Sequence, residues 1–339
     1  MKFEMHADVD LGAANTLGLP CRAEHVVEAR HRDQVRALAR SGIWRDGLTL
    51  LSGGSNLILP PRLGGITLRP RLTHWWLETR GEDALVHVGA GVNWHQLVMA
   101  MAEQGWWGIE NLALIPGQCG AAPVQNIGAY GVELADVLEW VTLVDLDSGE
   151  LERLSVGECG FGYRESCFKS ELDGRVVITE LTLRVTRRPR PRLDYGDLAQ
   201  RVPVNPSPLD VASAVVAVRQ EKLPDPAELG NAGSFFKNPV VDASLARSLI
   251  EAHPNMPHFP LTDGAVKLAA GWLIDQCGLK GWRQGHFAVH DRQALVLVHL
   301  GGGSAEELLD FAAWVADRVD QHFGVVLERE PRVAGSLVN

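Results

Sequence analysis

Three glycine-rich segments in the first half of the sequence constrain this chain more than any other feature. They span residues 51–57, 89–94 and 115–131, and each adjoins an apolar, strand-like run. Glycine lets a backbone bend sharply or approach a flat or anionic ligand closely. We therefore take these segments as the main functional signal in the sequence.

The first segment contains Gly53, Gly54, Ser55 and Asn56 between two apolar runs. Glycines in such a loop can turn successive amide groups inward as a phosphate-binding nest, and the two polar side chains add donors. A tight hairpin turn would be an equally good interpretation if this loop stood alone.

The second segment begins like a GxGxxG fingerprint, with Gly89 and Gly91, but has Trp94 in place of the third glycine. That glycine normally lets helix and strand pack closely, so a Rossmann dinucleotide site is disfavoured. The third segment has four glycines and three alanines with little helical or strand periodicity. Its small side chains indicate a backbone lying along a large planar cofactor; a long surface loop is the alternative.

Strand-like and helical patterns alternate at the start of the chain and give way to short strands after Gly131. We expect a strand at 25–27, a helix ending at Ser41-Gly42, strands at 48–51 and 85–88, a helix at 94–104 capped by Asn93, and strands at 137–146 and 176–185. Residues 184–192 contain five arginines and two prolines, so we expect an exposed connection there.

The second half of the chain begins with a helix from Pro208 to about Gln220, which residues 223–226 end. Further helices are expected at 243–252 and 266–277, and a strand at 294–300. Ser304 and Glu307 form a capping box before a helix that continues through Val319.

Composition excludes several classes of protein. A charged fraction of 22% with a net charge of -10 argues against a nucleic-acid binder, which would collect Lys and Arg. The N-terminal stretch from Met1 to Pro20 lacks a secretory signal pattern, and no window approaches the roughly 18 apolar residues of a membrane helix. Five scattered cysteines without a CxxC pair fit reduced thiols. We therefore expect a cytoplasmic protein without a membrane partner.

Twelve histidines raise the question of a metal site. The best pair, His286 and His290, lies in a strand-like run and lacks an HExxH motif or a nearby carboxylate set, so metal catalysis is not expected. Cys119 lies in the third segment without an adjacent basic group, and we interpret it as a small packing residue.

Several motifs, taken in order, resemble the UDP-N-acetylenolpyruvoylglucosamine reductase family, in its type I subgroup. They are GGSN at 53–56, IPG at 115–117, NIGAYG at 126–131, FGYRES at 161–166, GNAGSFFKNP at 230–239, KLAAGWLID at 267–275 and VLERE at 326–330. The resemblance covers nearly the whole chain.

The resemblance implies an α+β protein with an FAD-binding fold of the vanillyl-alcohol-oxidase (PCMH) type in two subdomains, residues 1–65 and 66–200. A C-terminal α+β substrate domain would follow at 208–325. Residues 326–339 would then form a last segment that carries Glu330 back to the active site.

The implied reaction uses non-covalent FAD and NADPH to reduce the enolpyruvyl group of UDP-N-acetylglucosamine enolpyruvate to UDP-N-acetylmuramate, in peptidoglycan biosynthesis. Hydride would reach C3 of the enolpyruvyl ether, leaving negative charge at C2 that spreads into the carboxylate. Such an intermediate needs a cation and an acid. We expect the enzyme to be a monomer.

The resemblance carries three catalytic roles over to this chain. Arg164 would pair with the substrate carboxylate and stabilise the developing charge. Ser234 would donate a proton to C2. Glu330 would assist this acid step, with Glu328 as the alternative; Pro331 departs from the family pattern and restricts Glu330 to extended backbone.

Binding residues are implied in the same way. Several relatives carry hydroxyl residues where this chain has Ala121 and Ala122, so backbone amides would do more of the cofactor binding. Tyr195, in the DYGD run at 194–197, would close over the substrate, and Lys222, Asn238 and Gln293 would contact its diphosphate. The cofactor set is Gly53, Gly54, Ser55, Asn56, Pro116, Gly117, Gly120, Ala121, Ala122, Asn126, Gly128 and Ala129; the substrate set is Tyr130, Tyr163, Tyr195, Lys222, Asn238 and Gln293.

Two other functions compete with this one. An alcohol or sugar oxidase on the same fold would usually tether its flavin through a loop histidine, which residues 53–56 lack. A non-catalytic nucleotide-sugar sensor would keep the glycine loops and diphosphate contacts but would need no acid.

Overall fold

The computed structural model of the chain describes residues 2–261 and 264–335. The chain folds into two compact units. Unit 1 contains residues 1–9, 23–53 and 64–221, whereas unit 2 contains residues 10–22, 54–63 and 222–339. Unit 2 therefore draws two short segments from the first quarter of the sequence. The domain boundaries expected from the sequence stay a prediction.

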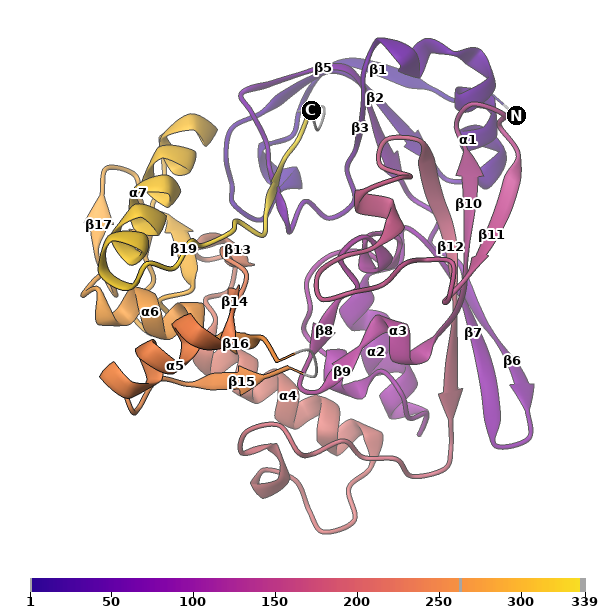
Figure 1. Cartoon of the computed structure of the whole chain (residues 1–339). Coiled ribbons are helices and arrows are strands. Elements are labelled where there is room, and N and C mark those ends of the chain that lie inside the picture. Colours follow the sequence, from indigo (N-terminus) through magenta and orange to yellow (C-terminus); the bar gives the residue numbers. More distant parts are fainter. Residues whose placement is uncertain (1, 262–263, 336–339) are drawn as a thin grey trace. The chain divides into compact units, whose positions relative to one another are not determined.

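A five-stranded antiparallel sheet is the main element of unit 1 (Figure 1). The helix α2 (Trp94–Glu103) buries Leu97, Val98 and Met101 in the same core as this sheet, and α4 (Pro208–Lys222) adds Val211 and Val215. The strand order is β11 (Leu151–Ser155), β10 (Leu138–Asp145), β12 (Val176–Thr186), β7 (Asp83–Gly89) and β6 (Trp75–Arg80).

A second sheet is formed by the start of the chain. Its order is β1 (Met5–Asp10), β2 (Arg22–Ala29), β5 (Arg62–Pro70) and β3 (Leu48–Leu50), with β3 parallel to β5. The helix α1 (Arg32–Ser41) lies between β2 and β3 in sequence and ends at Gly42, which has a φ of 71°. The expected strand–helix–strand order is confirmed, with β5 inserted between its two strands.

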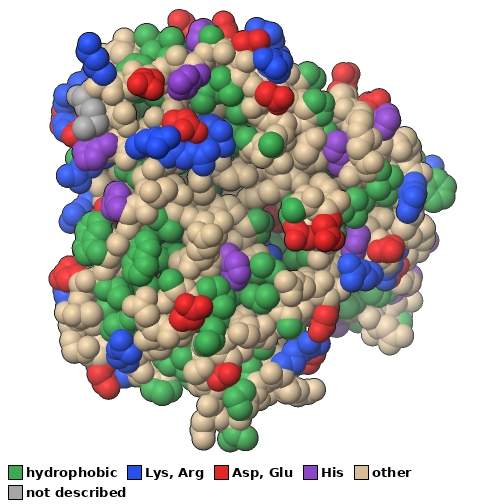
Figure 2. All heavy atoms as spheres, turned by 180° about the vertical axis from the view of Figure 1, so that it is seen from behind, with side chains coloured by type: hydrophobic (Ala, Val, Ile, Leu, Met, Phe, Trp, Pro, Cys, Tyr) green, Lys and Arg blue, Asp and Glu red, His purple; other side chains and the backbone are tan. Residues whose placement is uncertain are grey.

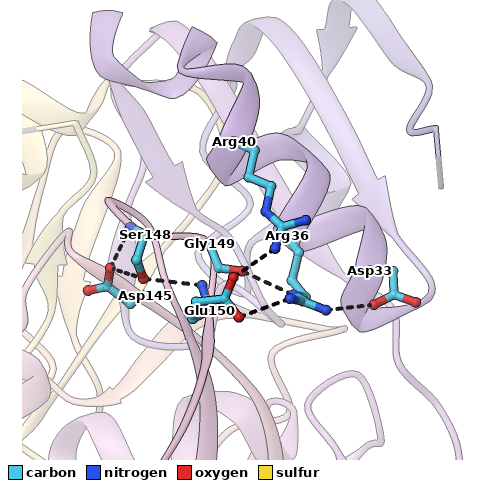
Figure 3. A network of polar contacts seen from close by, with 7 residues as sticks. All are labelled: Asp33, Arg36, Arg40, Asp145, Ser148, Gly149 and Glu150. Atoms are coloured by element: carbon cyan, nitrogen blue, oxygen red, sulfur yellow. Dashed lines mark hydrogen bonds and ion pairs between the residues drawn. The ribbon is translucent and has the colours of Figure 1, made fainter.

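A polar network joins α1 to the turn between β10 and β11 (Figure 3). Arg36 and Arg40 bind the two carboxylate oxygens of Glu150 at 3.1 and 2.8 Å. Asp145 accepts bonds from the amide and hydroxyl of Ser148, which shapes the turn. Exposed ion pairs contribute little one by one, but here they supplement an apolar contact that includes Val35 and Leu38.

Unit 2 has its own core between two small sheets and three helices. The first sheet contains β13 (Gly230–Ser234), β19 (Val296–His299), β18 (Phe287–Val289) and β17 (Arg283–Gln284) in that order. The helices are α5 (Ala243–Ala252), α6 (Ala270–Gln276) and α7 (Ala305–Phe323). The predicted capping box before α7 is confirmed, because the Ser304 hydroxyl and the Glu307 carboxylate each accept a bond from the other's amide.

One helix was predicted wrongly. Residues 266–277 were expected to be helical throughout, but Val266–Leu268 form the strand β16, and α6 begins only at Ala270. This strand is central in the second sheet, between β14 (Val240–Val241) and β15 (His258–Pro260). Pairing on both sides favours the extended backbone over the weak helical preference of three residues.

The surface carries charges of both signs. On the face shown in Figure 2, Lys and Arg side chains are interspersed with Asp and Glu. Within residues 2–261 and 264–335, every helix is too short or too polar to cross a membrane.

Candidate active site

The first and third glycine-rich loops touch backbone to backbone within unit 1. A Cβ atom added to Gly53 would lie 2.9 Å from the Cα of Gly117. The Ser52 hydroxyl donates to the side-chain oxygen of Gln118 at 2.8 Å. Because a Cβ atom rarely comes closer than about 3.4 Å to another heavy atom, this approach requires glycine at position 53.

The second and third loops meet in the same way. A Cβ atom on Gly120 would lie 2.5 Å from the Cβ of Ala90. The Gly120 amide donates to the Ala90 carbonyl at 2.9 Å, and the Trp94 amide donates to the Gly117 carbonyl at 3.1 Å. All three loops thus converge into one backbone-lined cradle, defined by Gly53, Ala90, Gly117 and Gly120. Small residues and backbone amide groups at this meeting point suit the close approach of a flat or anionic cofactor.

The third loop is more regular than its sequence indicated. Cys119–Gln125 form a 3-10 helix with Pro123 inside it. Ala121 is exposed on this turn, whereas Ala122 is buried. Cys119 is fully buried, and burial raises the pKa of its thiol, which agrees with a packing role.

Asn126 occupies a left-handed backbone position, with a φ of 42°. Its side-chain amide donates to Glu133 at 2.8 Å and to the Gly162 carbonyl at 3.2 Å, and its oxygen accepts the Ala135 amide at 3.0 Å. The side chain is committed to protein partners, so a cofactor contact from this residue would have to come from its backbone.

Arg164 lies at the tip of a tight turn held by Gly162 and Glu165, whose backbone groups pair in both directions. Its φ of 58° is unusual for a residue with a side chain, and such positions gather at functional sites. Its guanidinium donates to the Gly128 carbonyl at 3.3 Å and lies 5.5 Å from the centre of the Tyr163 ring. The turn thereby aims Arg164 at the 126–131 segment.

All three tyrosines of the chain belong to the candidate substrate set. Tyr130 has a φ of 50°, and its ring meets the edge of the Tyr195 ring at a centroid distance of 5.4 Å. Tyr195 is 53% exposed, whereas burial raises the pKa of the half-buried Tyr130 hydroxyl. The structure thus brings together two tyrosines from distant parts of the sequence.

Arg219 was missed by the sequence reasoning. It lies on α4, four positions after the buried Val215, so helical spacing could have placed it on the inward face. Its Nε atom is buried and has no hydrogen-bond partner in the described part of the chain. Burial lowers the pKa of its guanidinium; the Tyr130 hydroxyl opposes this shift and Arg164 adds to it. Arg219 is therefore a partly buried cation whose charge acts on two candidate site residues, Tyr130 and Arg164.

In unit 2, Ser234 ends β13 just after a bulge in the pairing with β19. Gly233 has a φ of 71°, and its amide donates to the buried side-chain oxygen of Asn231. Bulges of this kind re-aim a side chain, and the buried Phe235 then fixes the backbone on the far side.

The C-terminal segment runs beside Ser234. The Glu330 amide donates to the Phe235 carbonyl at 2.9 Å, and the Lys237 amide donates to the Glu328 carbonyl at 2.8 Å. The Glu328 side chain is 71% exposed and forms an ion pair with Lys237. Unit 2 therefore brings Glu330, from the end of the chain, next to Ser234.

Asn238 and Gln293 meet at the start of α6. The Asn238 oxygen accepts the amide of Ala270, and the Gln293 oxygen would lie 3.0 Å from a Cβ atom on Gly271. Lys222 is exposed at the end of α4. The two amide side chains thus share one location, although they come from separate parts of the sequence.

The rest of the first loop belongs to unit 2. Gly54 has a φ of 61°, and a Cβ there would come within 2.3 Å of the Ala14 carbonyl. The Asn56 carbonyl accepts the Arg332 amide, where β4 (Leu57–Ile58) pairs in parallel with β20 (Arg332–Val333). Ser55, in this loop, is partly exposed. Pro116, in the third loop, is exposed.

His290 is buried, and its Nδ1 atom accepts the Gln293 amide at 3.2 Å. Among residues 2–261 and 264–335, His, Cys, Asp and Glu side chains form no group of three suited to hold a metal ion.

Comparisons with known proteins find matches over both halves of this chain. Residues 23–155 match an FAD binding domain, and residues 225–334 match the C-terminal domain of UDP-N-acetylenolpyruvoylglucosamine reductase. The protein of that name from Chromobacterium violaceum is 50% identical, over 98% of this chain and 100% of its own length. The one from Shewanella baltica is 46% identical, over 96% of both chains. The crystal structure of the Thermus caldophilus reductase is similar, with a TM-score of 0.67 and 25% identity over 98% of both chains.

Proposed function

This chain belongs to the UDP-N-acetylenolpyruvoylglucosamine reductase family, and on that premise we propose that Arg164, Ser234 and Glu330 act on the enolpyruvyl group of its substrate. The enzyme reduces UDP-N-acetylglucosamine enolpyruvate to UDP-N-acetylmuramate in peptidoglycan synthesis, with NADPH and FAD. The assignment of individual residues to steps is the proposal.

The backbone cradle is the observation that carries the proposal. Gly53, Gly117 and Gly120 would hold FAD, which would supply hydride chemistry between NADPH and C3 of the enolpyruvyl group. Gly53 and Gly120 cannot accept a side chain without a clash below 3 Å, and Gly117 is the backbone that Gly53 would meet, so the three loops can pack this closely only with these glycines in place. Ser55 and Asn56 follow Gly53 in the same glycine-rich segment, and their amide groups are chemically suited to a phosphate.

Arg164 would hold the substrate carboxylate. Its guanidinium offers a fork of donors that matches a carboxylate, and its charge would stabilise the enolate-like intermediate as it forms. The tight turn at 162–165 and the Lys169 ammonium, which donates to the Arg164 carbonyl at 2.8 Å, hold the backbone in place. Such preorganisation spares the cost of moving the cation during the reaction.

Ser234 would give its hydroxyl proton to C2 of the intermediate. A serine is a weak acid, but a carbanion is basic enough to take its proton at hydrogen-bond distance. Glu330, one backbone hydrogen bond away from Phe235, would support this transfer. Pro331 lacks an amide donor, yet the Glu330 amide still reaches the Phe235 carbonyl. The Glu328 side chain is 71% exposed and paired with Lys237, which supports Glu330 over Glu328.

Replacing Ser234 by Ala tests the proposal. Reduction of enzyme-bound FAD by NADPH should keep its wild-type rate, whereas reoxidation of the reduced enzyme by the enolpyruvyl substrate should slow by about 10²-fold or more. Ser248→Ala, on the exposed face of α5, is the control. Both half-reactions are followed by flavin absorbance in a stopped-flow instrument. An unchanged second half-reaction would remove Ser234 from the mechanism.

We also propose that the enzyme is a cytoplasmic monomer that binds its substrate and NADPH without a nucleic-acid or membrane partner. Its five cysteines are all free thiols, which fits a reducing compartment. Light scattering after size exclusion tests the monomer, since a dimer would double the mass of 37.0 kDa.

A further inference from the structure

Asn111 is a fully buried polar residue in the short 3-10 helix Glu110–Leu112 of unit 1. Its side-chain amide nitrogen donates two hydrogen bonds of 2.8 Å each, one to the Tyr130 carbonyl and one to the Arg192 carbonyl. These two acceptors belong to separate loops, far apart in the sequence. One side chain therefore ties the two loops together.

The identity of this side chain follows from its partners. Both partners are carbonyl oxygens, so only an NH₂ group can face them, and an aspartate of the same shape could not. The Asn111 oxygen on the other side is buried without a hydrogen-bond partner among the described residues. An unpaired buried acceptor costs free energy, so the two donor bonds must offset that cost.

The two tied loops are those that carry Tyr130 and Tyr195. The Arg192 carbonyl lies three positions before Tyr195, in an otherwise exposed stretch of chain. The two rings meet edge to face at 5.4 Å. The Tyr195 loop is therefore anchored to the Tyr130 loop twice, by a ring contact that is largely exposed and by a buried amide.

We propose that Asn111 is a positioning residue for substrate binding, which sets the resting place of the Tyr195 loop against Tyr130. The inference rests on the proposed function, in which both tyrosines contact the UDP-sugar. With the buried amide in place, the start of the exposed Tyr195 loop is held against the Tyr130 loop before the substrate arrives. Less ordering then remains to be done on binding, which lowers the substrate Kd.

The test uses the FAD-loaded enzyme and the variant Asn111→Asp, which keeps the side-chain shape, removes the donor pair and places a carboxylate against the two carbonyl oxygens. The substrate Kd, from the absorbance change of bound FAD, should rise by about tenfold, as expected for losing one to two hydrogen bonds. The rate of FAD reduction by NADPH should change by less than about twofold. Thr179→Val is the control, because it removes another buried bond in unit 1, from the Thr179 hydroxyl to the Thr142 carbonyl.

A direct readout comes from the three tyrosines, since protein labelled with ¹³C at the tyrosine Cζ gives three resonances. In Asn111→Asp the signals of Tyr130 and Tyr195 should shift or broaden while that of Tyr163 stays. A general loss of packing would move all three, and so would overturn the inference. Should Asn111→Asp fail to fold, Asn111→Ser, which keeps one donor, takes its place in the same measurements.

Coupling to Tyr195 decides between the inference and its premise. In a Tyr195→Ala background, adding Asn111→Asp should raise the substrate Kd by clearly less than tenfold, because only the Tyr130 loop is left to position. A Kd that rises tenfold in both backgrounds overturns the role of Asn111. The role of Asn111 is also overturned if Tyr195→Ala weakens substrate binding and Asn111→Asp does not. If Tyr195→Ala leaves the substrate Kd unchanged, the premise fails, because Tyr195 then has no part in substrate binding.

Discussion

Replacing Gly53 by Ala tests whether backbone contact between the first and third loops builds the FAD site. Gly53 has no positive φ, so alanine adds no backbone strain of its own. Its new Cβ would meet the Gly117 Cα at 2.9 Å, and ordinary contact begins near 3.4 Å. The loops must therefore separate by about 0.5 Å, the difference between these two distances.

Overpacking of this kind costs about 1–3 kcal/mol. If the strain is relieved by opening the cradle, the Kd for FAD should rise by about 5- to 140-fold, at tenfold per 1.4 kcal/mol. The Kd is measured by titrating apoprotein with FAD and following the quenching of flavin fluorescence. Thermal unfolding of the apoprotein reports the cost to the fold in parallel.

Gly157→Ala is the matched control for this change. Gly157 is exposed in the same unit, has no positive φ, and an added Cβ would find nothing within 4 Å. The control should bind FAD as tightly as the wild type. If Gly53→Ala also binds FAD within twofold of the wild type, the cradle does not depend on this close approach, and the reasoning is refuted.

Three more outcomes are expected. Leu327→Ala should lower the free energy of unfolding by about 2–4 kcal/mol, whereas its 75% exposed neighbour Val326→Ala should stay within about 0.5, as measured by urea denaturation. Burial, together with the charge of Asp10, raises the pKa of the Cys21 thiol to about 11. Because the folded protein holds this proton more tightly than the unfolded chain, the free energy of unfolding should fall as the pH rises from about 9 to 11. It should fall less in Cys21→Ala. Arg219→Met should raise the pKa of Tyr130 further, since it removes a nearby positive charge; a ¹³C-tyrosine titration in which that pKa falls or stays would contradict this.

Much of the architecture was predictable because its signals are local. The helix after Asn93, the capping box at Ser304 and the strands at 138–145 and 176–186 follow from periodicity and end signals that lie close together in the sequence. The sequence also indicated that the backbone is closely approached at Gly53, Gly117 and Gly120. It could not predict that the loops carrying these glycines contact one another, because it does not say which loop each glycine faces.

What the sequence could not reveal depends on distant partners. The strand β16 exists because β14 and β15 pair with it on either side. Asn126 was selected for the cofactor, yet its side-chain groups bind Glu133, Gly162 and Ala135, a fact set by the folded turn. Asn111 carried no signal beyond being polar in an apolar run, since its two acceptors lie 19 and 81 residues away.

The composition of unit 2 has a consequence for the order of events during synthesis. Unit 1 is complete once residue 221 has left the ribosome, but unit 2 borrows residues 10–22 and 54–63 and also needs residues 325–335. Its early segments carry Leu17, Leu19 and Ile58, all of which are fully buried in the finished protein. These apolar side chains lack their packing partners while most of the remaining chain is synthesised, at roughly 5–20 residues per second. The nascent chain is therefore most exposed to aggregation and chaperone capture in the interval before its last residues arrive.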